Sequence, residues 1–372
     1  MSNASALYGG ERSLLEIVNV MGPAWRPVFV VPQKGPYSAA LDEANYPYEV
    51  VPVPHGPQYS RRWFLRVLQL AWVIRRQRPS LVHANLQWAV PLVAAASRIS
   101  GVPFVAHLRN MISGPLDERE KKYFGNAAAV ICISHAVKSA ACDAGILPPE
   151  KQDRIWIIPD ARDLSKYIDG KRPRVRAELG VSDDVALIGM IARIDPMKGQ
   201  HLFLDAAALI AEKMPRVHFV LAGDLMNNRD DYLEMLRRRC DDAHLKNRVS
   251  FLGYRRDVPD ILAALDCFVH PSSRGAFVSV LIEAMATGIP IVVPDLDGIP
   301  ECVGREGAAE LMSTLQPLDW ANAVIQIIKD PRRRARMALE GRERAKCFEA
   351  LYLAHETEKV FENCCCEKLR SG

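Results

Sequence analysis

Short apolar runs alternate with helix-like segments along almost the whole chain, and this rhythm limits the fold more than any other feature. Parallel strands need crossover connections, usually helices, so the alternation predicts an α/β protein with parallel sheets covered on both faces. The expected strands of a first series are 26–31, 48–53, 80–83, 104–107, 129–134 and 155–159, and those of a second are 186–192, 218–222, 249–253, 267–270 and 291–294.

The two series predict two Rossmann-like domains that face each other across a cleft. At 372 residues the chain exceeds the size at which one hydrophobic core usually stops growing. Residues 160–175, rich in Asp, Lys, Arg and Pro, resemble a solvated linker between the series. We expect a first domain over residues 1–165, a second over 166–345, and a C-terminal helical segment, 346–372, that packs back on the first.

Composition and charge narrow the choice of partners and compartment. A formal net charge of +4 is too weak to indicate a nucleic-acid partner in the absence of a basic patch. Most of the nine cysteines are scattered singly, which is typical of reduced core thiols, and the consecutive Cys364, Cys365 and Cys366 are given no role. No apolar run is long enough for a membrane span and no signal segment begins the chain, so a cytoplasmic protein is expected.

In open parallel sheets, ligands bind where the carboxyl ends of strands lead into helices. Gly9 and Gly10 open a helical pattern and would let a phosphate or a sugar approach the backbone, although a glycine pair is also common in plain turns. Arg193 and Lys198 follow strand 186–192. They would supply two cations to a diphosphate, although such side chains also decorate exposed loops.

A third candidate loop follows strand 267–270 and carries Gly275, Ala276 and Phe277. It leads into a helix in which Glu283 lies among apolar residues, so its carboxylate needs hydrogen-bonding partners such as ribose hydroxyls. The alternative is a glutamate on the exposed face of that helix. The next strand is followed by a turn made of Gly298, Ile299, Pro300 and Glu301.

The order of these motifs resembles the family 4 glycosyltransferases, which are retaining enzymes of the GT-B fold. Ala192-Arg193 through Lys198-Gly199 looks like the family's strand-to-arginine-to-lysine element, and Glu283 through Ala286 looks like its Glu-Ala-Met-Ala helix. The remaining matches are Gly9-Gly10-Glu11, Ile133-Ser134, Leu221-Ala222-Gly223, Gly288-Ile289-Pro290 and Gly298 through Glu301.

The resemblance implies a hexosyltransferase that moves a sugar from a UDP- or GDP-sugar to a hydroxyl of a glycan, lipid-linked or small-molecule acceptor, as in polysaccharide biosynthesis. It implies no metal and no cofactor, because the nucleotide sugar is a co-substrate. Arg193 and Lys198 would stabilise the leaving diphosphate, Glu283 would bind ribose, and the backbone amides of residues 298–301 would approach the donor phosphates. His107 would lie near the donor sugar, or would be an ordinary hydrogen-bonded histidine.

The sequence departs from the family pattern in three places. Gly275 stands where the family has a glutamate that contacts the donor sugar, and Asp160 through Asp163 replaces the family's Asn-Gly-x-Asp. The strand that normally precedes the glycine loop is missing before Gly9. Two further readings therefore remain, a catalytically weak nucleotide-sugar-binding protein of the same fold and a UDP-sugar epimerase.

The segment 61–76 combines aromatic and apolar residues with basic ends. Such a helix would dock on anionic lipid at the inner membrane surface, or it would cover one face of the first sheet as a core helix. We favour the core helix and expect at most weak peripheral contact with a membrane.

Overall fold

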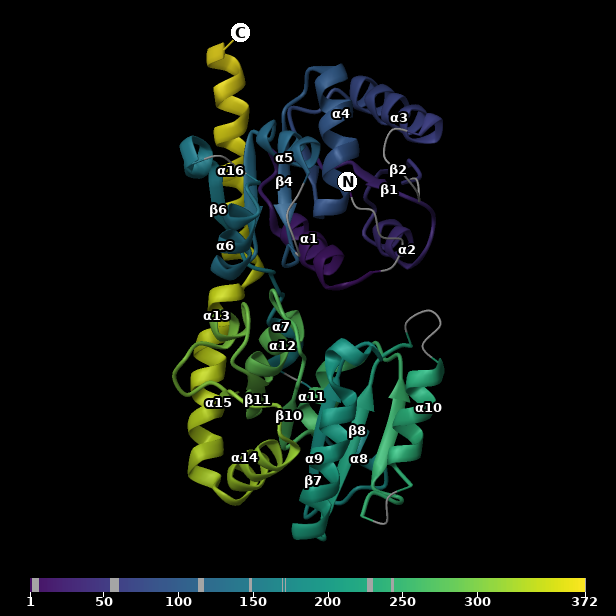
Figure 1. Cartoon of the computed structure of the whole chain (residues 1–372), viewed down its shortest axis with the longest axis vertical. Helices are drawn as coiled ribbons and strands as arrows, with labels where there is room; N and C mark the ends of the chain where they lie inside the picture. Colours follow the sequence, from purple (N-terminus) through teal and green to yellow (C-terminus); the bar gives the residue numbers. More distant parts are fainter. Residues whose placement is uncertain are drawn as a thin grey trace. The chain divides into compact units, whose positions relative to one another are not determined.

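The computed structural model describes residue 1 and residues 7–53, 60–112, 117–146, 149–168, 170, 172–225, 230–241 and 244–371. The chain divides into two compact units (Figure 1). Unit 1 contains Met1–Arg162 and Glu349–Gly372, and unit 2 contains Asp163–Phe348. Both units are α/β with parallel sheets. Within the described residues, no helix has the length and apolar character that crossing a bilayer requires.

Unit 2 is built on a six-stranded parallel sheet in the order β12-β11-β10-β7-β8-β9. Its strands are β7 (Ala186–Ile191), β8 (Val217–Ala222), β9 (Val249–Gly253), β10 (Cys267–Val269), β11 (Ile291–Pro294) and β12 (Glu310–Met312). The first five correspond to the strands expected from their apolar runs. The edge strand β12 was not expected, because its two apolar residues, Leu311 and Met312, follow Glu310 and do not form a continuous apolar run.

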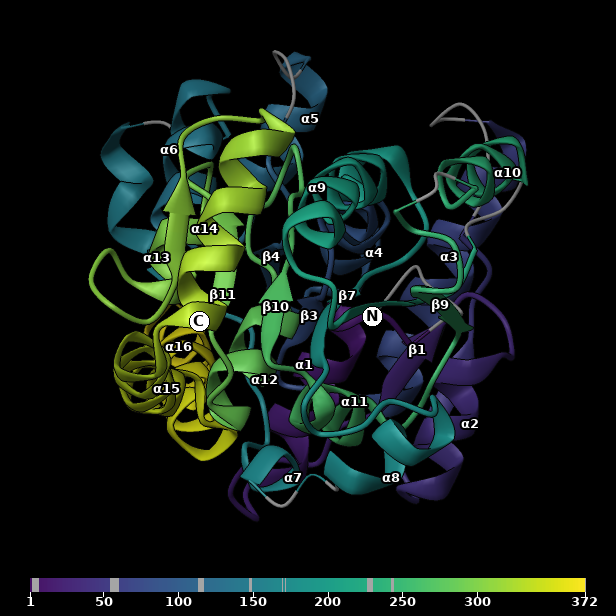
Figure 2. The same cartoon turned by 90° about the horizontal axis from the view of Figure 1, so that it is seen from below.

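Helices cover both faces of this sheet (Figure 2). One face carries α9 (Gln200–Lys213) and α14 (Pro317–Lys329), whose Trp320 is almost completely buried. The helices of the other side are α8 (Arg172–Glu178), α11 (Val258–Ala264), α12 (Ser279–Thr287) and α15 (Pro331–Ala345), and unit 2 also contains α7 (Ser165–Ile168), α10 (Asp230–Arg239) and α13 (Ile299–Val303). Because both faces are covered, strands such as β11 are buried at every position.

Unit 1 contains two separate parallel sheets, β1-β2 and β3-β4-β5-β6. Their strands are β1 (Phe29–Val31), β2 (Tyr48–Val50), β3 (Val82–Ala84), β4 (Phe104–Leu108), β5 (Ala129–Cys132) and β6 (Ile155–Ile157). In the described part of the chain no strand precedes α1 (Gly9–Val20). Met1 instead lies along the edge of β3, where its N-terminal amine donates to His83 O (2.5 Å) and its carbonyl accepts from Asn85 N (2.9 Å).

The C-terminal helix α16 (Ala350–Ser371) packs against α1 within unit 1. Phe361 of α16 contacts Trp25 edge to face, with ring centroids 5.5 Å apart, and Glu358 accepts a hydrogen bond from Gly22 N (2.6 Å). The other helices of unit 1 are α2 (Pro36–Glu43), α3 (Arg61–Gln77), α4 (Val90–Ser100), α5 (Glu118–Gly125) and α6 (His135–Asp143).

The start of the expected solvated linker is buried in unit 1. Asp160, Ala161 and Arg162 are each at most 5% exposed. Asp160 pairs with Arg109, and Ala161 N donates to Ser13 Oγ (2.8 Å). The expectation of a solvated segment was wrong here because its charges are neutralised by partners distant in sequence, which composition alone does not reveal.

Candidate functional site

The loop after β7 holds Arg193 and Lys198 in a fixed conformation. Asp195 Oδ1 accepts from Met197 N (2.9 Å) and caps the short 3-10 turn Pro196–Lys198. Gln200, at the start of α9, is fully buried and its Nε2 donates to Arg193 O (2.7 Å). The loop is therefore anchored at both ends, and both cationic side chains are half-buried.

The electrostatics of this loop suit an anionic ligand. Burial, followed by the charge of Arg193, lowers the pKa of Lys198, and Asp195 partly offsets both effects. Lys198 Nζ makes no hydrogen bond or ion pair within the described residues. Two cations thus lie close enough to repel each other, and a bound anion such as a diphosphate would relieve that repulsion.

Gly199 joins this loop to the loop that follows β10. Its φ of +80° lies in the left-handed region, and a Cβ added there would stand 2.0 Å from Pro271 O. Ser273 N also donates to Met197 O (2.9 Å). Only glycine combines this backbone conformation with such a close approach, so it brings the two predicted loops together.

His270, at the end of β10, is a site residue that the sequence did not single out. Its ring is buried, stacks on Phe268 at 17°, and has no hydrogen-bond partner for either nitrogen in the described part of the chain. Burial, and secondarily the charge of Lys198, lowers its pKa to about 3. The imidazole is therefore neutral beside the cationic loop, and its position at a strand end was the only signal available in sequence.

The third predicted segment joins the same end of the sheet. Gly275 N donates to Asp297 Oδ2 (3.0 Å), and Gly298 N donates to Gly275 O (3.0 Å). A Cβ at position 275 would lie 2.8 Å from Ile299 Cδ1, so a larger residue requires Ile299 to move. The structure thus gathers the loops after β7, β10 and β11, which carry most of the predicted site residues.

The backbone amides of the turn after β11 are less available than the sequence suggested. Gly298 N is engaged by Gly275 O, Ile299 N donates to Leu296 O (3.1 Å), and Pro300 has no N–H. Ile299 and Pro300 are buried, and Glu301 is half-buried. The amides of Gly298 and Ile299 are thus already engaged, and an approach of phosphates to this turn stays a prediction.

Glu283 lies inside unit 2 and is only 5% exposed, so the reading as an exposed-face glutamate is wrong. Its helix α12 packs between β11, α11 and α15, which leaves no solvated face at this position. Ala276 and Phe277 in the preceding loop are half-buried, and the Phe277 ring contacts Phe348 with centroids 5.5 Å apart. A buried carboxylate beside these loops is suited to accept hydrogen bonds from a ligand's hydroxyls.

Unit 1 has its own cluster at the predicted glycine loop. Gly9 and Gly10 begin α1, and a Cβ at Gly10 would lie 2.8 Å from Arg109 Cδ. Asn85 Nδ2 donates to Gly10 O (3.4 Å) and Asn85 O accepts from Arg109 Nε (3.1 Å). Gly10 therefore makes room for Arg109, which no sequence motif had indicated.

Arg109 is buried and paired with Asp160, 51 residues later in the chain. Burial lowers the pKa of Arg109, and the charges of Asp160 and Glu11 act in the opposite direction. The only sequence signal for Arg109 was its place two residues beyond His107 at the end of β4, and nothing in the sequence linked it to Asp160.

His107 is buried next to Arg109. Its Nδ1 lies 3.3 Å from Arg109 Nη2 and 3.2 Å from His83 Nε2, and its Nε2 has no hydrogen-bond partner among the described residues. Burial, then the charges of Arg109 and His83, hold its pKa well below the usual value. Because Nδ1 accepts from the guanidinium, the neutral ring carries its proton on Nε2.

Two family profiles match the chain. Residues 171–344 match the profile described as "Glycosyl transferases group 1", and residues 8–166 match the one described as "Glycosyltransferase Family 4". Together they account for most of both units.

Curated relatives and solved structures are similar to the chain at low identity. It is 27% identical over 285 residues to D-inositol 3-phosphate glycosyltransferase of Nocardia farcinica, a match that spans 74% of this chain but 61% of that enzyme. It is 27% identical over 281 residues to UDP-Gal:alpha-D-GlcNAc-diphosphoundecaprenol alpha-1,3-galactosyltransferase of Escherichia coli, covering 71% of this chain and 70% of that one. The structure of Anabaena Alr3699/HepE with UDP and glucose aligns at a TM-score of 0.85 and 25% identity, covering 97% of each chain.

Proposed function

Because the chain belongs to the family 4, group 1 glycosyltransferases and has their GT-B fold, we propose that it transfers a hexose from a UDP-sugar to a hydroxyl acceptor with retention of configuration. The observation that carries this proposal is the half-buried pair Arg193 and Lys198, whose mutual repulsion a diphosphate would relieve. UDP is favoured as the nucleotide because Alr3699/HepE has been solved with UDP and with UDP-glucose and the E. coli relative is named for UDP-Gal.

In this proposal the loops of unit 2 hold the donor. Arg193 and Lys198 neutralise the diphosphate as it leaves, and Glu283 accepts hydrogen bonds from the ribose hydroxyls. Charge stabilisation of this kind contributes roughly 100-fold to 1,000-fold in turnover for one well-placed group. Gly275 offers no carboxylate to the donor sugar, so sugar recognition falls to the backbone and side chains of the neighbouring Ala276 and Phe277.

The reaction needs neither a dedicated protein base nor a metal. The acceptor hydroxyl oxygen forms a bond to the anomeric carbon on the face from which the diphosphate departs, while the bond from that carbon to the phosphate oxygen breaks. The departing phosphate oxygen takes the acceptor proton, and Arg193 and Lys198 stabilise the UDP that results. The two cations thereby occupy the role that a divalent ion has in other transferases.

Unit 1 is proposed to bind the acceptor. The protonated Nε2 of His107 is a donor for which the described residues provide no acceptor, and a sugar hydroxyl would satisfy it. Gly9 and Gly10 expose backbone at the start of α1, where an acceptor's phosphate or hydroxyl would be favoured.

A lipid-linked acceptor is the class that best suits the exposed face of α3. Phe64, Leu65, Leu68 and Trp72 form an apolar stripe on this helix, with exposed fractions between 52% and 63%. Basic residues flank the stripe, and the Arg76 guanidinium lies 4.6 Å from the Trp72 ring centroid. The opposite face of α3 is buried, so the helix serves the core and leaves this stripe for an anionic lipid surface.

Vesicle sedimentation tests the membrane part of the proposal. The chain should bind vesicles that contain anionic lipid more strongly than zwitterionic ones, and replacing Leu65 and Leu68 by Ser should weaken binding with no change in UDP affinity. Equal binding to both kinds of vesicle, or no binding to either, would show that the α3 stripe does not recognise anionic lipid.

Donor turnover tests the main proposal. The protein is incubated with UDP-glucose, UDP-galactose, UDP-N-acetylglucosamine and GDP-mannose, and release of the nucleotide is measured with and without acceptor extracts. We expect UDP release from at least one UDP-sugar. Binding of UDP without any turnover would favour the catalytically weak binding protein, and interconversion of two UDP-sugars without release would favour the epimerase.

A further inference from the structure

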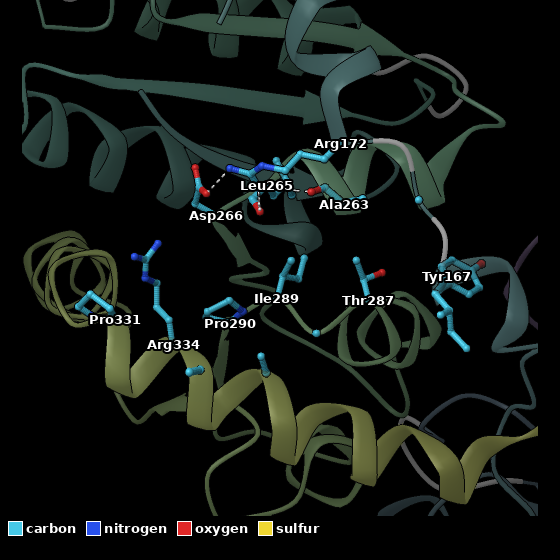
Figure 3. Close-up of a pocket in the computed structure, with 15 residues that line it drawn as sticks. Tyr167, Arg172, Ala263, Leu265, Asp266, Thr287, Ile289, Pro290, Pro331 and Arg334 are labelled. Carbon is cyan, nitrogen blue, oxygen red and sulfur yellow. Dashed lines mark hydrogen bonds and ion pairs between the residues drawn. The ribbon is translucent and has the colours of Figure 1, made fainter. Parts of the chain in front are cut away.

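Unit 2 contains a cavity of about 420 Å³ (Figure 3). Its walls include Leu265 and Asp266, just before β10, and Ile289 and Pro290, just before β11. Strands β7, β10 and β11 run parallel, so residues before them lie at the opposite end of the sheet from the loops that follow them. The cavity is therefore distinct from the Arg193 and Lys198 loop.

The charges around the cavity are unbalanced. Arg172 of α8 reaches it with Nη2 2.7 Å from Asp266 Oδ1, and Arg176 Nη1 lies 3.4 Å from Asp266 Oδ2. Arg334, in the first turn of α15, is a further lining residue. Arg176 does not line the cavity and also pairs with Asp183. Among the lining residues, two arginines (Arg172 and Arg334) are accompanied by one carboxylate (Asp266), so the wall carries an excess of positive charge.

Arg334 has a buried hydrogen-bond donor for which the described residues supply no acceptor. Its Nε is buried without a partner, and within the described residues its side chain forms no hydrogen bond or ion pair. Figure 3 shows its guanidinium extending from α15 toward the side where Asp266 and Arg172 lie. Arginine stays protonated in proteins, so the unmet donor cannot be removed by deprotonation, and leaving it unpaired is unfavourable.

The size and lining of the cavity define the class of ligand. Its volume falls in the range of small-molecule sites, and apolar side chains such as Leu265, Ile289 and Ala338 form part of the wall. Planar guanidinium groups pair best with carboxylate or phosphate oxygens. We propose that this cavity is a second ligand site of unit 2, which binds a small organic oxyanion such as a phosphate monoester or a polycarboxylate at the same time as the donor.

Helix α12 connects the two sites. Its C-terminal Thr287 and the following Gly288 line the cavity, and Thr287 Oγ1 donates to the carbonyl of Glu283, one turn earlier (2.9 Å). This part rests on the proposed role of Glu283 in holding the donor ribose. An occupant that contacts the end of α12 is expected to change the affinity for UDP, and UDP must then change the affinity for the occupant by the same factor.

Calorimetry with inorganic phosphate and with citrate, each titrated into protein already saturated with UDP, tests the site. We expect one of these anions to bind, and Arg334→Met, which keeps the aliphatic stem, to weaken it by about tenfold or more. Arg332→Met is the matched control, because Arg332 is exposed on the same helix turn and does not line the cavity. Lys198→Ala should leave anion binding unchanged.

Several results would overturn the inference. Absence of binding by both anions at millimolar concentration would do so. Binding that survives Arg334→Met but is lost in Lys198→Ala would locate the anion on the donor loops instead. An unchanged UDP affinity in the presence of a bound anion would remove the coupling through α12. UDP binding measured without either anion reports separately on the proposed function, so the two failures are distinguishable.

Discussion

Arg109 in unit 1 and Lys198 in unit 2 are both shielded from solvent, but only Arg109 has a carboxylate partner. Arg109 is buried and pairs with Asp160, and it also contacts Asn85 and His107. Lys198 is half-buried beside Arg193, and the nearby Asp195 uses a carboxylate oxygen to cap the turn instead. The charge of Arg109 is thus satisfied within the fold, whereas Lys198 forms no ion pair with the described residues and is available to a ligand.

This difference predicts that Arg109 contributes mainly to the stability of unit 1 and Lys198 mainly to activity. A buried ion pair that loses one member leaves an uncompensated charge in a medium of low polarity. Lys198 is repelled by Arg193 and therefore does not stabilise the folded state. Removing Lys198 should mainly weaken the binding of the ligand that both cations contact. Substitutions in the two units should therefore fail in different ways.

The largest effect is expected from Arg109→Met. The substitution strands Asp160 and removes the hydrogen bonds to Asn85, so we expect the free energy of unfolding of unit 1 to fall by about 3–5 kcal/mol. Chemical denaturation followed by intrinsic fluorescence measures this change. A fall below about 1 kcal/mol would show that the Arg109 and Asp160 pair is not structural, which breaks the comparison.

Lys198→Met should have the complementary effect. Turnover of the UDP-sugar should fall roughly 100-fold to 1,000-fold, because one of two charges on the leaving diphosphate is lost, while the unfolding midpoint stays within a few degrees of wild type. Lys213→Met, at the exposed end of α9, is the matched control and should change neither quantity. Equal turnover in both variants would remove Lys198 from the reaction.

His270 sharpens the comparison through pH. Its pKa of about 3 in the folded state lies below the value of 6.5 expected when unfolded, so the unfolded chain binds the proton more readily. The stability that this neutral histidine confers is complete above pH 6.5 and is lost as the pH falls from 6.5 toward 3. Between pH 6.5 and 4.5 wild type should lose about 2 kcal/mol more than His270→Phe. Chemical denaturation at both pH values measures this difference. An equal loss of unfolding free energy in wild type and in His270→Phe would contradict the prediction.

The smallest effect is expected from metal removal. If Arg193 and Lys198 supply the charge that stabilises the diphosphate, dialysis against EDTA should change turnover by less than about twofold. An assay with and without added Mg²⁺ or Mn²⁺ checks this. Recovery of activity that depends on one of these ions would mean that the cationic loop alone is insufficient.

Much of the fold could be predicted because its signals are local. Buried parallel strands such as β7 and β11 are continuous apolar runs, and the loops that follow them can be named from the sequence once the strands are found. The three loops of unit 2 were predicted in this way. The edge strand β12 was missed because only two of its residues, Leu311 and Met312, are apolar.

The parts that escaped prediction depend on contacts between distant residues. The pairing of Arg109 with Asp160 joins two β-strand ends 51 residues apart, and the charged composition around Asp160 suggested solvent instead. The amides of Gly298 and Ile299 are engaged by backbone carbonyls that no sequence pattern identifies. In both cases the hydrogen-bond partners, which decide burial and availability, are set by the tertiary fold.

A crystal structure of the protein with UDP tests the central claim most directly. We predict the diphosphate within hydrogen-bonding distance of both Arg193 and Lys198 Nζ, with a ribose hydroxyl donating to Glu283. A nucleotide bound elsewhere, or a diphosphate with no contact to either cation, would contradict the account.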